Sequence, residues 1–240
     1  MLPLGDDREP GGPAAIVTIA LIALNVLAFF VELSQPSGGA LQSFIEAWGV
    51  VPREYSAGRD LAPSIPLPFW STLVTSMFLH GGWAHLGGNM LFLWIFGDNI
   101  ERRLGHARFL AFYLACGLAA GLAHILFNIH STMPTVGASG AISGVMGGYL
   151  LLFPNNRVRV MTQGGITAVP AFVMLGLWIL IQLVSGFGAV ATTEETGGGV
   201  AFMAHVGGFV AGLVLVWIFR RRQPELAARA GRDWAGRASY

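Results

Sequence analysis

The sequence contains no lysine, a single cysteine and few charged residues of any kind. Charged residues make up 11% of its 240 positions, whereas a soluble domain carries about 25%. Hydrophobic residues make up 54% of the chain, so there are too few polar side chains to cover a water-exposed surface. The lone Cys116 excludes an internal disulfide. No basic run is long enough to bind nucleic acid, so we expect no nucleic-acid partner.

Six apolar runs divide the chain, each bounded by charges, prolines or glycine clusters. A bilayer-spanning helix needs about 20 apolar residues, so six such helices would take about half of a chain of this length. The runs lie at residues 14–31, 83–96, 109–129, 138–153, 166–186 and 200–219. We therefore predict an all-α polytopic membrane protein, with a bundle of six transmembrane helices within residues 14–219.

The placement of arginines predicts the orientation of this bundle, because positive residues are retained on the cytoplasmic side. With the N-terminus inside, all 14 basic residues except Arg53 and Arg59 lie inside. We therefore predict an N-in/C-in topology, with a short cytoplasmic N-terminus at residues 1–13 and an Arg-rich cytoplasmic tail at 220–240. Residues 32–68 form a long loop that does not span the membrane.

The start of the chain also bears on localisation. Its acidic residues fit neither a transit peptide nor the basic start of a cleaved signal, so we expect the first apolar run to be retained. Together with the compact length and the use of arginine alone, this favours a bacterial plasma membrane. An organellar membrane is the alternative.

Polar residues that can do chemistry gather at the start of the second, fourth and sixth apolar runs. Ionisable side chains within membrane spans are costly and usually face a cavity or a partner. Since these three helices run in the same direction, their first turns share one depth in the outer leaflet. The residues in that layer are His85, Asn89, Ser139 and His205.

This layer contains the parts needed for serine acyl transfer. Ser139 begins its helix, where unpaired N–H groups and the helix dipole favour a developing oxyanion. His205 can take the serine proton. His85 and Asn89 lie four residues apart, on one helical face, and can donate hydrogen bonds. No Asp or Glu lies at this depth to orient the histidine, so we predict a Ser139–His205 dyad.

Small residues recur every four positions in the fourth and sixth runs. Such stripes permit close approach of helix backbones, which would bring the Ser139 hydroxyl near the His205 imidazole. The fourth run has 16 residues, or roughly 24 Å against a hydrocarbon core of about 30 Å, so a water-filled cavity can lie above it. The stripes are Gly140, Gly144 and Gly148 in the fourth run and Ala204, Gly208 and Gly212 in the sixth.

Other polar residues are weaker candidates. Ser143 lies one turn below Ser139, but deeper in the helix. His80 is predicted to be structural and to bind the preceding loop, while His124 and His130 have no partner that the sequence identifies.

Two other classes of site can be weighed from the sequence. A metal site of His80, His85 and His205 lacks both an HExxH motif and a nearby carboxylate, so we expect no metal and no cofactor. A small transporter would place its polar groups near the bilayer midplane, whereas here they cluster in the outer leaflet.

Three stretches occur in a fixed order: FLHGGWAHLGGNM from Phe78, GASGAISG from Gly137 and AHVGG from Ala204. Together they resemble the rhomboid family of intramembrane serine proteases, over about residues 14–219. Residues 97–102 also resemble a turn that follows the second helix in this family. One departure is that the first loop lacks the Trp-Arg pair that many members carry.

The resemblance implies Ser139 as the nucleophile and His205 as the general base. It implies His85, Asn89 and the backbone N–H of Ser139 as donors to the oxyanion. The implied substrates are single-pass transmembrane proteins, cut near the outer leaflet in contact with membrane lipid. The alternative is a non-catalytic rhomboid-like protein that binds transmembrane helices, which the presence of both Ser139 and His205 disfavours.

Overall fold

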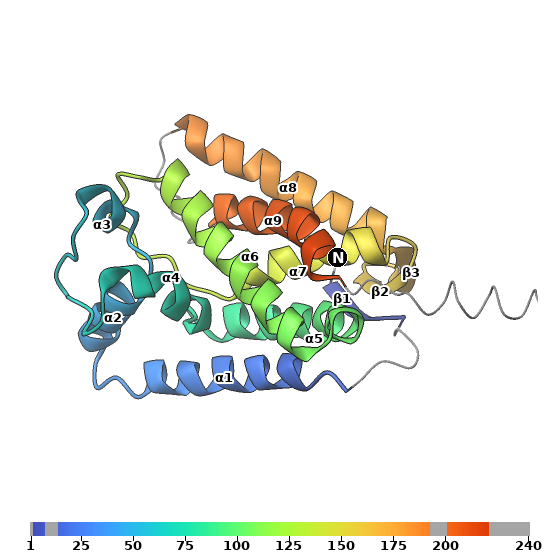
Figure 1. The fold of residues 1–240 in the computed structure, drawn as a ribbon, viewed down its shortest axis with the longest axis horizontal. Helices are drawn as coiled ribbons and strands as arrows, with labels where there is room; N and C mark the ends of the chain where they lie inside the picture. The colour runs from blue at the N-terminus through green and yellow to red at the C-terminus, as the bar shows by residue number, and fades with distance from the viewer. Residues whose placement is uncertain (1, 8–13, 193–200, 221–240) are drawn as a thin grey trace, which may run out of the picture.

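The chain folds into a helical bundle with a small antiparallel sheet at one end (Figure 1). The computed structural model describes residues 2–7, 14–192 and 201–220, so most of the predicted tail at 220–240 lies outside the described residues. The helices are α1 Ile16–Leu33, α2 Gly38–Trp48, α3 Pro52–Ala57, α4 Thr72–Thr75, α5 Trp83–Leu104, α6 His106–Phe127, α7 Ser139–Leu152, α8 Ala171–Thr192 and α9 Phe202–Phe219. The strands are β1 Leu2–Asp6, β2 Arg157–Thr162 and β3 Gly165–Pro170, and 3-10 turns lie at Phe69–Ser71 and Ser76–Phe78.

The longest helices, α1 and α5 to α9, overlap the six apolar runs. Among the described residues, α1, α6 and α9 are long and apolar enough to cross a membrane, judged by length and composition. Shorter apolar stretches lie at Ser139–Leu152 and Ala171–Phe187. The prediction of a mostly helical polytopic membrane protein is confirmed, while the number of spans and their orientation stay predictions.

Helix α7 occupies the centre of the bundle. Figure 1 shows α1 along one edge beside α5 and α8 along the opposite edge, with α6, α7 and α9 between them. Helix α7 packs against α5, α6, α8 and α9, and every residue from Gly140 to Tyr149 is buried. Because so many neighbours crowd it, the small residues of this helix are what allow the bundle to close.

Helix α5 continues beyond its predicted end. We predicted a span ending at residue 96 and a turn over residues 97–102, but the helix runs to Leu104, so that prediction is wrong. Gly105 ends it, with a φ of 83° that a residue with a side chain rarely adopts.

The last turns of α5 carry a buried carboxyl group whose hydrogen-bond donors come largely from α1. The carboxylate of Glu101 is fully buried and accepts hydrogen bonds from the backbone N–H groups of Val17 at 2.8 Å and Thr18 at 2.7 Å. The Thr18 hydroxyl donates at 2.7 Å and His106 Nδ1 lies 2.6 Å away. Glu101 therefore satisfies the unpaired N–H groups at the start of α1.

A three-stranded antiparallel sheet lies where we expected loops and a plain N-terminus. Strands β2 and β3 form a hairpin, and β1 pairs with β2 so that Leu2 lies opposite Met161. Val158 and Val160 are buried and alternate with exposed residues along β2, as expected of a half-buried strand. Helix α8 accordingly begins at Ala171 rather than at residue 166.

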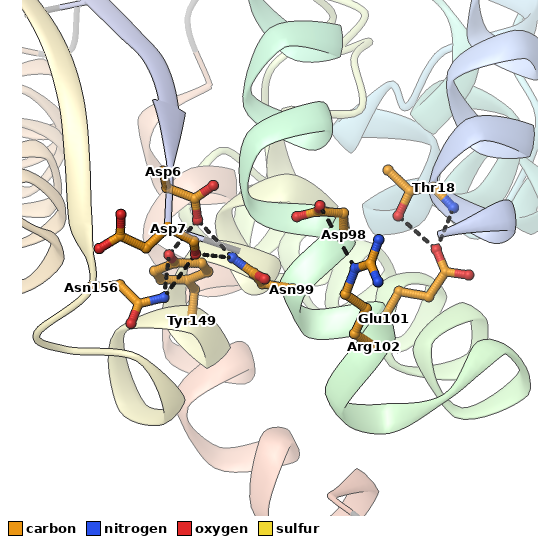
Figure 2. Close-up of polar contacts among 9 residues, drawn as sticks. All are labelled: Asp6, Asp7, Thr18, Asp98, Asn99, Glu101, Arg102, Tyr149 and Asn156. Carbon is orange, nitrogen blue, oxygen red and sulfur yellow. Dashed lines mark hydrogen bonds and ion pairs between the residues drawn. The ribbon is translucent and has the colours of Figure 1, made fainter. Parts of the chain in front are cut away.

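Strand β1 is held by polar side chains from the ends of α5 and α7 that face the sheet (Figure 2). The Asp6 carboxylate accepts hydrogen bonds from the Tyr149 hydroxyl of α7 and from Nδ2 of Asn99 of α5. The backbone carbonyl of Asp7 accepts from Nδ2 of Asn99 at 2.9 Å and of Asn156 at 3.1 Å. Burial raises the pKa of Asp6 to about 6. Residues 2–7 are thus bound to the bundle.

The long first loop contains two short helices, α2 and α3, and is tied to the segments that lead into α5 and α7. Glu32, at the end of α1, is 2% exposed, and its carboxylate oxygens accept the backbone N–H of His80 at 3.0 and 3.1 Å. Val50 and Thr135 exchange backbone hydrogen bonds of 3.0 and 2.8 Å. The loop therefore braces the chain just before Ser139.

Helices α7 and α9 touch backbone to backbone along their small-residue stripes. A Cβ added at Gly208 would overlap the carbonyl oxygen of Gly140, and a Cβ at Gly212 would overlap that of Gly144. A Cβ at Gly144 would overlap the side chain of Cys116 on α6. The prediction that the two stripes face each other is confirmed.

We expect Gly208→Val to lower the free energy of unfolding by about 3 kcal/mol or more, because the new side chain must push α7 and α9 apart. Thermal unfolding in detergent measures this effect. Gly176→Val on α8 is the matched control, since a Cβ there meets nothing within 4 Å. Equal melting temperatures for the two variants would contradict the close packing.

Candidate active site

Ser139 is the first residue of α7, and its side chain borders a cavity. The preceding Gly137 has a φ of 132°, and its N–H donates to the carbonyl of Ser76 at 2.8 Å. A Cβ at Gly137 would lie 2.9 Å from the His85 imidazole, so only glycine fits this turn. The turn thus places Ser139 at the start of α7, where the first backbone N–H groups have no partner within the helix.

His205 of α9 is hydrogen-bonded to Ser139, with 2.8 Å between Nε2 and Oγ. This distance is suitable for transfer of the serine proton to the imidazole. It follows from the contact of the two helices, because a Cβ at Gly140 would lie 3.7 Å from the carbonyl oxygen of Ala204. Each reactive side chain therefore stands one residue away from a point where α7 and α9 come close together.

Two side chains of α8 contact the far side of the His205 ring. Oε1 of Gln182 lies 2.7 Å from Nδ1, and the rings of Trp178 and His205 are tilted by 38° with centroids 5.8 Å apart. Sequence reasoning missed both residues, because it considered only carboxylates as partners for the histidine. The available signal was a tryptophan and a glutamine four residues apart, hence on one face of an otherwise apolar helix.

His85 of α5 faces Ser139 across the cavity. Its Nδ1 accepts the backbone N–H of Gly81 at 3.3 Å, so the proton of the neutral ring is on Nε2. That nitrogen borders the space beside Gly137 that Ser139 Oγ also borders. The His80 ring packs edge-on against His85 with centroids 5.2 Å apart, and the bond to the loop predicted for His80 is made by its backbone N–H.

Asn89 lies one turn further along α5 and lines the same cavity. It is 7% exposed, and among the described residues its buried Nδ2 has no hydrogen-bond partner. Leaving a buried donor unpaired costs about 1–3 kcal/mol. This side chain is therefore a donor that a bound acceptor can satisfy.

The cavity has a volume of about 530 Å³ and brings together all four residues singled out in the sequence. It combines a mostly apolar wall with a few convergent polar groups, as small binding sites usually do. The 14 residues of α7 span roughly 21 Å, less than the hydrocarbon core of about 30 Å. A serine at one end of this helix can therefore lie below the membrane surface.

The remaining candidates have structural partners or lie apart from the site. Ser143 is fully buried, and its hydroxyl donates to the backbone carbonyl of Ser139 at 2.6 Å. His124 contacts the Thr135 hydroxyl at 2.7 Å and borders the cavity. His130 is exposed. Within residues 2–7, 14–192 and 201–220, no group of three or more His, Cys, Asp or Glu side chains could hold a metal ion.

Comparison with known families agrees with this geometry. The protein-family model described as "Rhomboid domain" matches residues 68–222. This is more than half of the chain and includes all four site residues. The chain belongs to the rhomboid family. The resemblance seen in the sequence is thus confirmed, and with its long apolar helices this rhomboid is an integral membrane protein.

Curated relatives of this rhomboid include a bacterial protein and proteins named as mitochondrial or chloroplastic. It is 33% identical over 196 residues to Rhomboid protease GluP of Bacillus subtilis (strain 168), a match covering 81% of this chain and 33% of the relative. It is 31% identical over 170 residues to Rhomboid protein 1, mitochondrial, of Saccharomyces cerevisiae, covering 67% of this chain and 46% of the relative. It is 29% identical over 160 residues to Rhomboid-like protein 11, chloroplastic, of Arabidopsis thaliana, covering 64% and 54%. The match therefore spans between a third and about half of the length of these relatives.

Proposed function

We propose that this rhomboid is a serine endopeptidase that cleaves single-pass transmembrane proteins within the membrane. The observation that carries the proposal is the 2.8 Å hydrogen bond between Ser139 Oγ and His205 Nε2, at a cavity that is also lined by His85 and by the unsatisfied donor of Asn89. The relative named Rhomboid protease GluP supports a protease activity. The presence of both reactive side chains argues against the alternative, a non-catalytic protein that binds transmembrane helices.

The geometry supports the following first half-reaction. Ser139 Oγ attacks the carbonyl carbon of the scissile bond while its proton passes to His205 Nε2. The oxyanion that forms accepts hydrogen bonds from His85 Nε2–H, Asn89 Nδ2–H and the backbone N–H of Ser139. His205 then gives its proton to the leaving amine as the C–N bond breaks, which leaves an ester on Ser139.

Hydrolysis of the ester repeats these steps with water as the nucleophile. Water loses a proton to His205 Nε2 and attacks the ester carbonyl, and the same three donors hold the second oxyanion. His205 returns the proton to Ser139 Oγ as the ester bond breaks. The enzyme is restored, and the substrate leaves as a carboxylate and an amine.

The wider setting of the site is also part of the proposal. We take residues 14–219 as the protease domain, in an N-in/C-in topology that places Ser139 in the outer leaflet. Residues 1–13 and 220–240 are then cytoplasmic. A bacterial plasma membrane stays a proposal, because the named relatives include mitochondrial and chloroplastic proteins.

We expect Ser139→Ala and His205→Ala each to abolish cleavage of a transmembrane substrate, because nucleophile and base act as one unit. Turnover of purified protein in lipid vesicles measures this. Ser143→Ala is the matched control, since it removes a hydroxyl that is bonded to the helix backbone, and we expect it to retain cleavage. Turnover that persists in Ser139→Ala would exclude the mechanism. Binding of helices without cleavage by the unaltered protein would favour the non-catalytic alternative.

We expect Asn89→Ala to lower kcat by on the order of 10²–10³, the usual cost of one lost oxyanion donor. Its melting temperature should stay close to that of the unaltered protein, because Asn89 Nδ2 has no partner to lose among the described residues. Kinetics and thermal unfolding on the same preparation test both parts. A normal kcat would show that Asn89 does not reach the oxyanion.

We expect cleavage to favour substrate helices that are already weak near their outer end. Breaking helical hydrogen bonds in lipid leaves groups that cost several kcal/mol each, whereas Gly or Pro lowers helix stability by about 1–3 kcal/mol beforehand. The test replaces the outer-leaflet Gly and Pro of one cleaved substrate by Leu and keeps the residues at the cut. An unchanged rate and position of cleavage would show that unwinding does not select substrates.

A further inference from the structure

The structure assigns a positioning role to Gln182 of α8: its side-chain carbonyl holds His205 in the tautomer that can accept the proton of Ser139. This inference rests on the proposed function. Gln182 then takes the place beside His205 that a carboxylate takes in a Ser-His-Asp triad.

The assignment follows from the hydrogen bonds at the two ring nitrogens of His205. Oε1 of Gln182 lies 2.7 Å from Nδ1 and can only accept, so Nδ1 must carry the proton. Nε2 is then unprotonated and can accept from Ser139 Oγ at 2.8 Å. If the ring proton were on Nε2 instead, the base would point an N–H at the serine and could not take its proton. One hydrogen bond to Gln182 therefore sets which nitrogen can act as base.

A neutral amide suits this place better than a carboxylate. Gln182 is 9% exposed and belongs to an apolar helix, where an ionised Asp or Glu would be costly. A buried amide left unpaired is also costly, so the bond to His205 benefits both residues. The amide cannot stabilise a charged imidazolium as strongly as a carboxylate can, but it fixes the ring.

Trp178 completes the support from the same face of α8. It lies four residues before Gln182 and packs against the His205 ring with centroids 5.8 Å apart. The imidazole is thus held at Nδ1 by Gln182 and at Nε2 by Ser139, with Trp178 packed beside the ring. Rotation of the ring would break both hydrogen bonds.

The first test compares Gln182→Met with Ile181→Met. Methionine keeps the length of glutamine but offers no comparable acceptor, and Ile181 is 51% exposed on the same helix, so its replacement serves as the matched control. For Gln182→Met we expect kcat to fall about 10- to 100-fold, as for a weakened general base, with KM within twofold. A kcat within twofold of the control overturns the inference.

Gln182→Glu provides the conservative rescue and a pH readout. The carboxylate still accepts from Nδ1, so at its own pH optimum this variant should be more active than Gln182→Met. Because a carboxylate favours the protonated ring, the acid limb of kcat/KM should move to higher pH. His85 of α5 and His124 of α6 are the other titratable side chains near His205, and both are present in every variant compared. A Glu variant no more active than the Met variant, with an unmoved acid limb, contradicts the role.

The tautomer can be read directly without any change at Gln182. In protein labelled with ¹⁵N-histidine, the signals of His205 are identified by their loss in His205→Asn, and their shifts report which nitrogen is protonated. We expect Nδ1–H at neutral pH, and Nε2–H overturns the inference even if Gln182→Met fails to fold. Failure of the proposed function looks different, since Ser139→Ala would then cleave whatever Gln182 does.

Discussion

The close contact of α7 and α9 is the interaction on which the site depends. Lipid offers no hydrophobic gain for bringing two apolar helices together, so their association rests on van der Waals packing. Glycines at 144, 208 and 212 let the two backbones come into contact. The side chain of Cys116 on α6 packs against Gly144. Ser139 lies one residue before Gly140, whose carbonyl oxygen meets Gly208, and His205 lies one turn before Gly208. Their separation is therefore set by backbone packing and not by flexible side chains.

Carboxylates placed at both ends of α1 fix α5, the other helix of the site. Glu32 at the end of α1 binds the backbone of His80, just before α5. Glu101 near the end of α5 binds the start of α1. Each buried carboxyl group accepts hydrogen bonds from N–H or O–H donors, which offsets part of the cost of burying it. These two sets of hydrogen bonds hold α5 in the orientation in which His85 and Asn89 line the cavity.

The six apolar runs, together with the predicted direction in which each helix crosses the membrane, predicted much of this arrangement. Six runs gave the long helices, and the matched starts of three of them put Ser139, His205, His85 and Asn89 at one cavity. The stripes of small residues predicted which faces meet. These signals are local or follow from simple counting, so a sequence can carry them.

Features that depend on long-range polar partners were missed. The predicted end of α5 was too early because Glu101 looks like a loop residue until the start of α1 supplies its donors. The sheet was missed because β1 pairs with β2 more than 140 positions away, where Leu2 meets Met161. Gln182 was missed because the sequence does not show which residue of α9 an amide on α8 contacts.

The central claim is that Ser139 is a nucleophile activated by His205 inside the membrane domain. Its most direct test is to react the purified protein in lipid vesicles with a fluorophosphonate and to map the adduct by mass spectrometry. The account predicts an adduct on Ser139 that forms far more slowly in His205→Asn, with Ser143 unmodified in both. No adduct on Ser139, or an adduct that forms equally fast without His205, would contradict it.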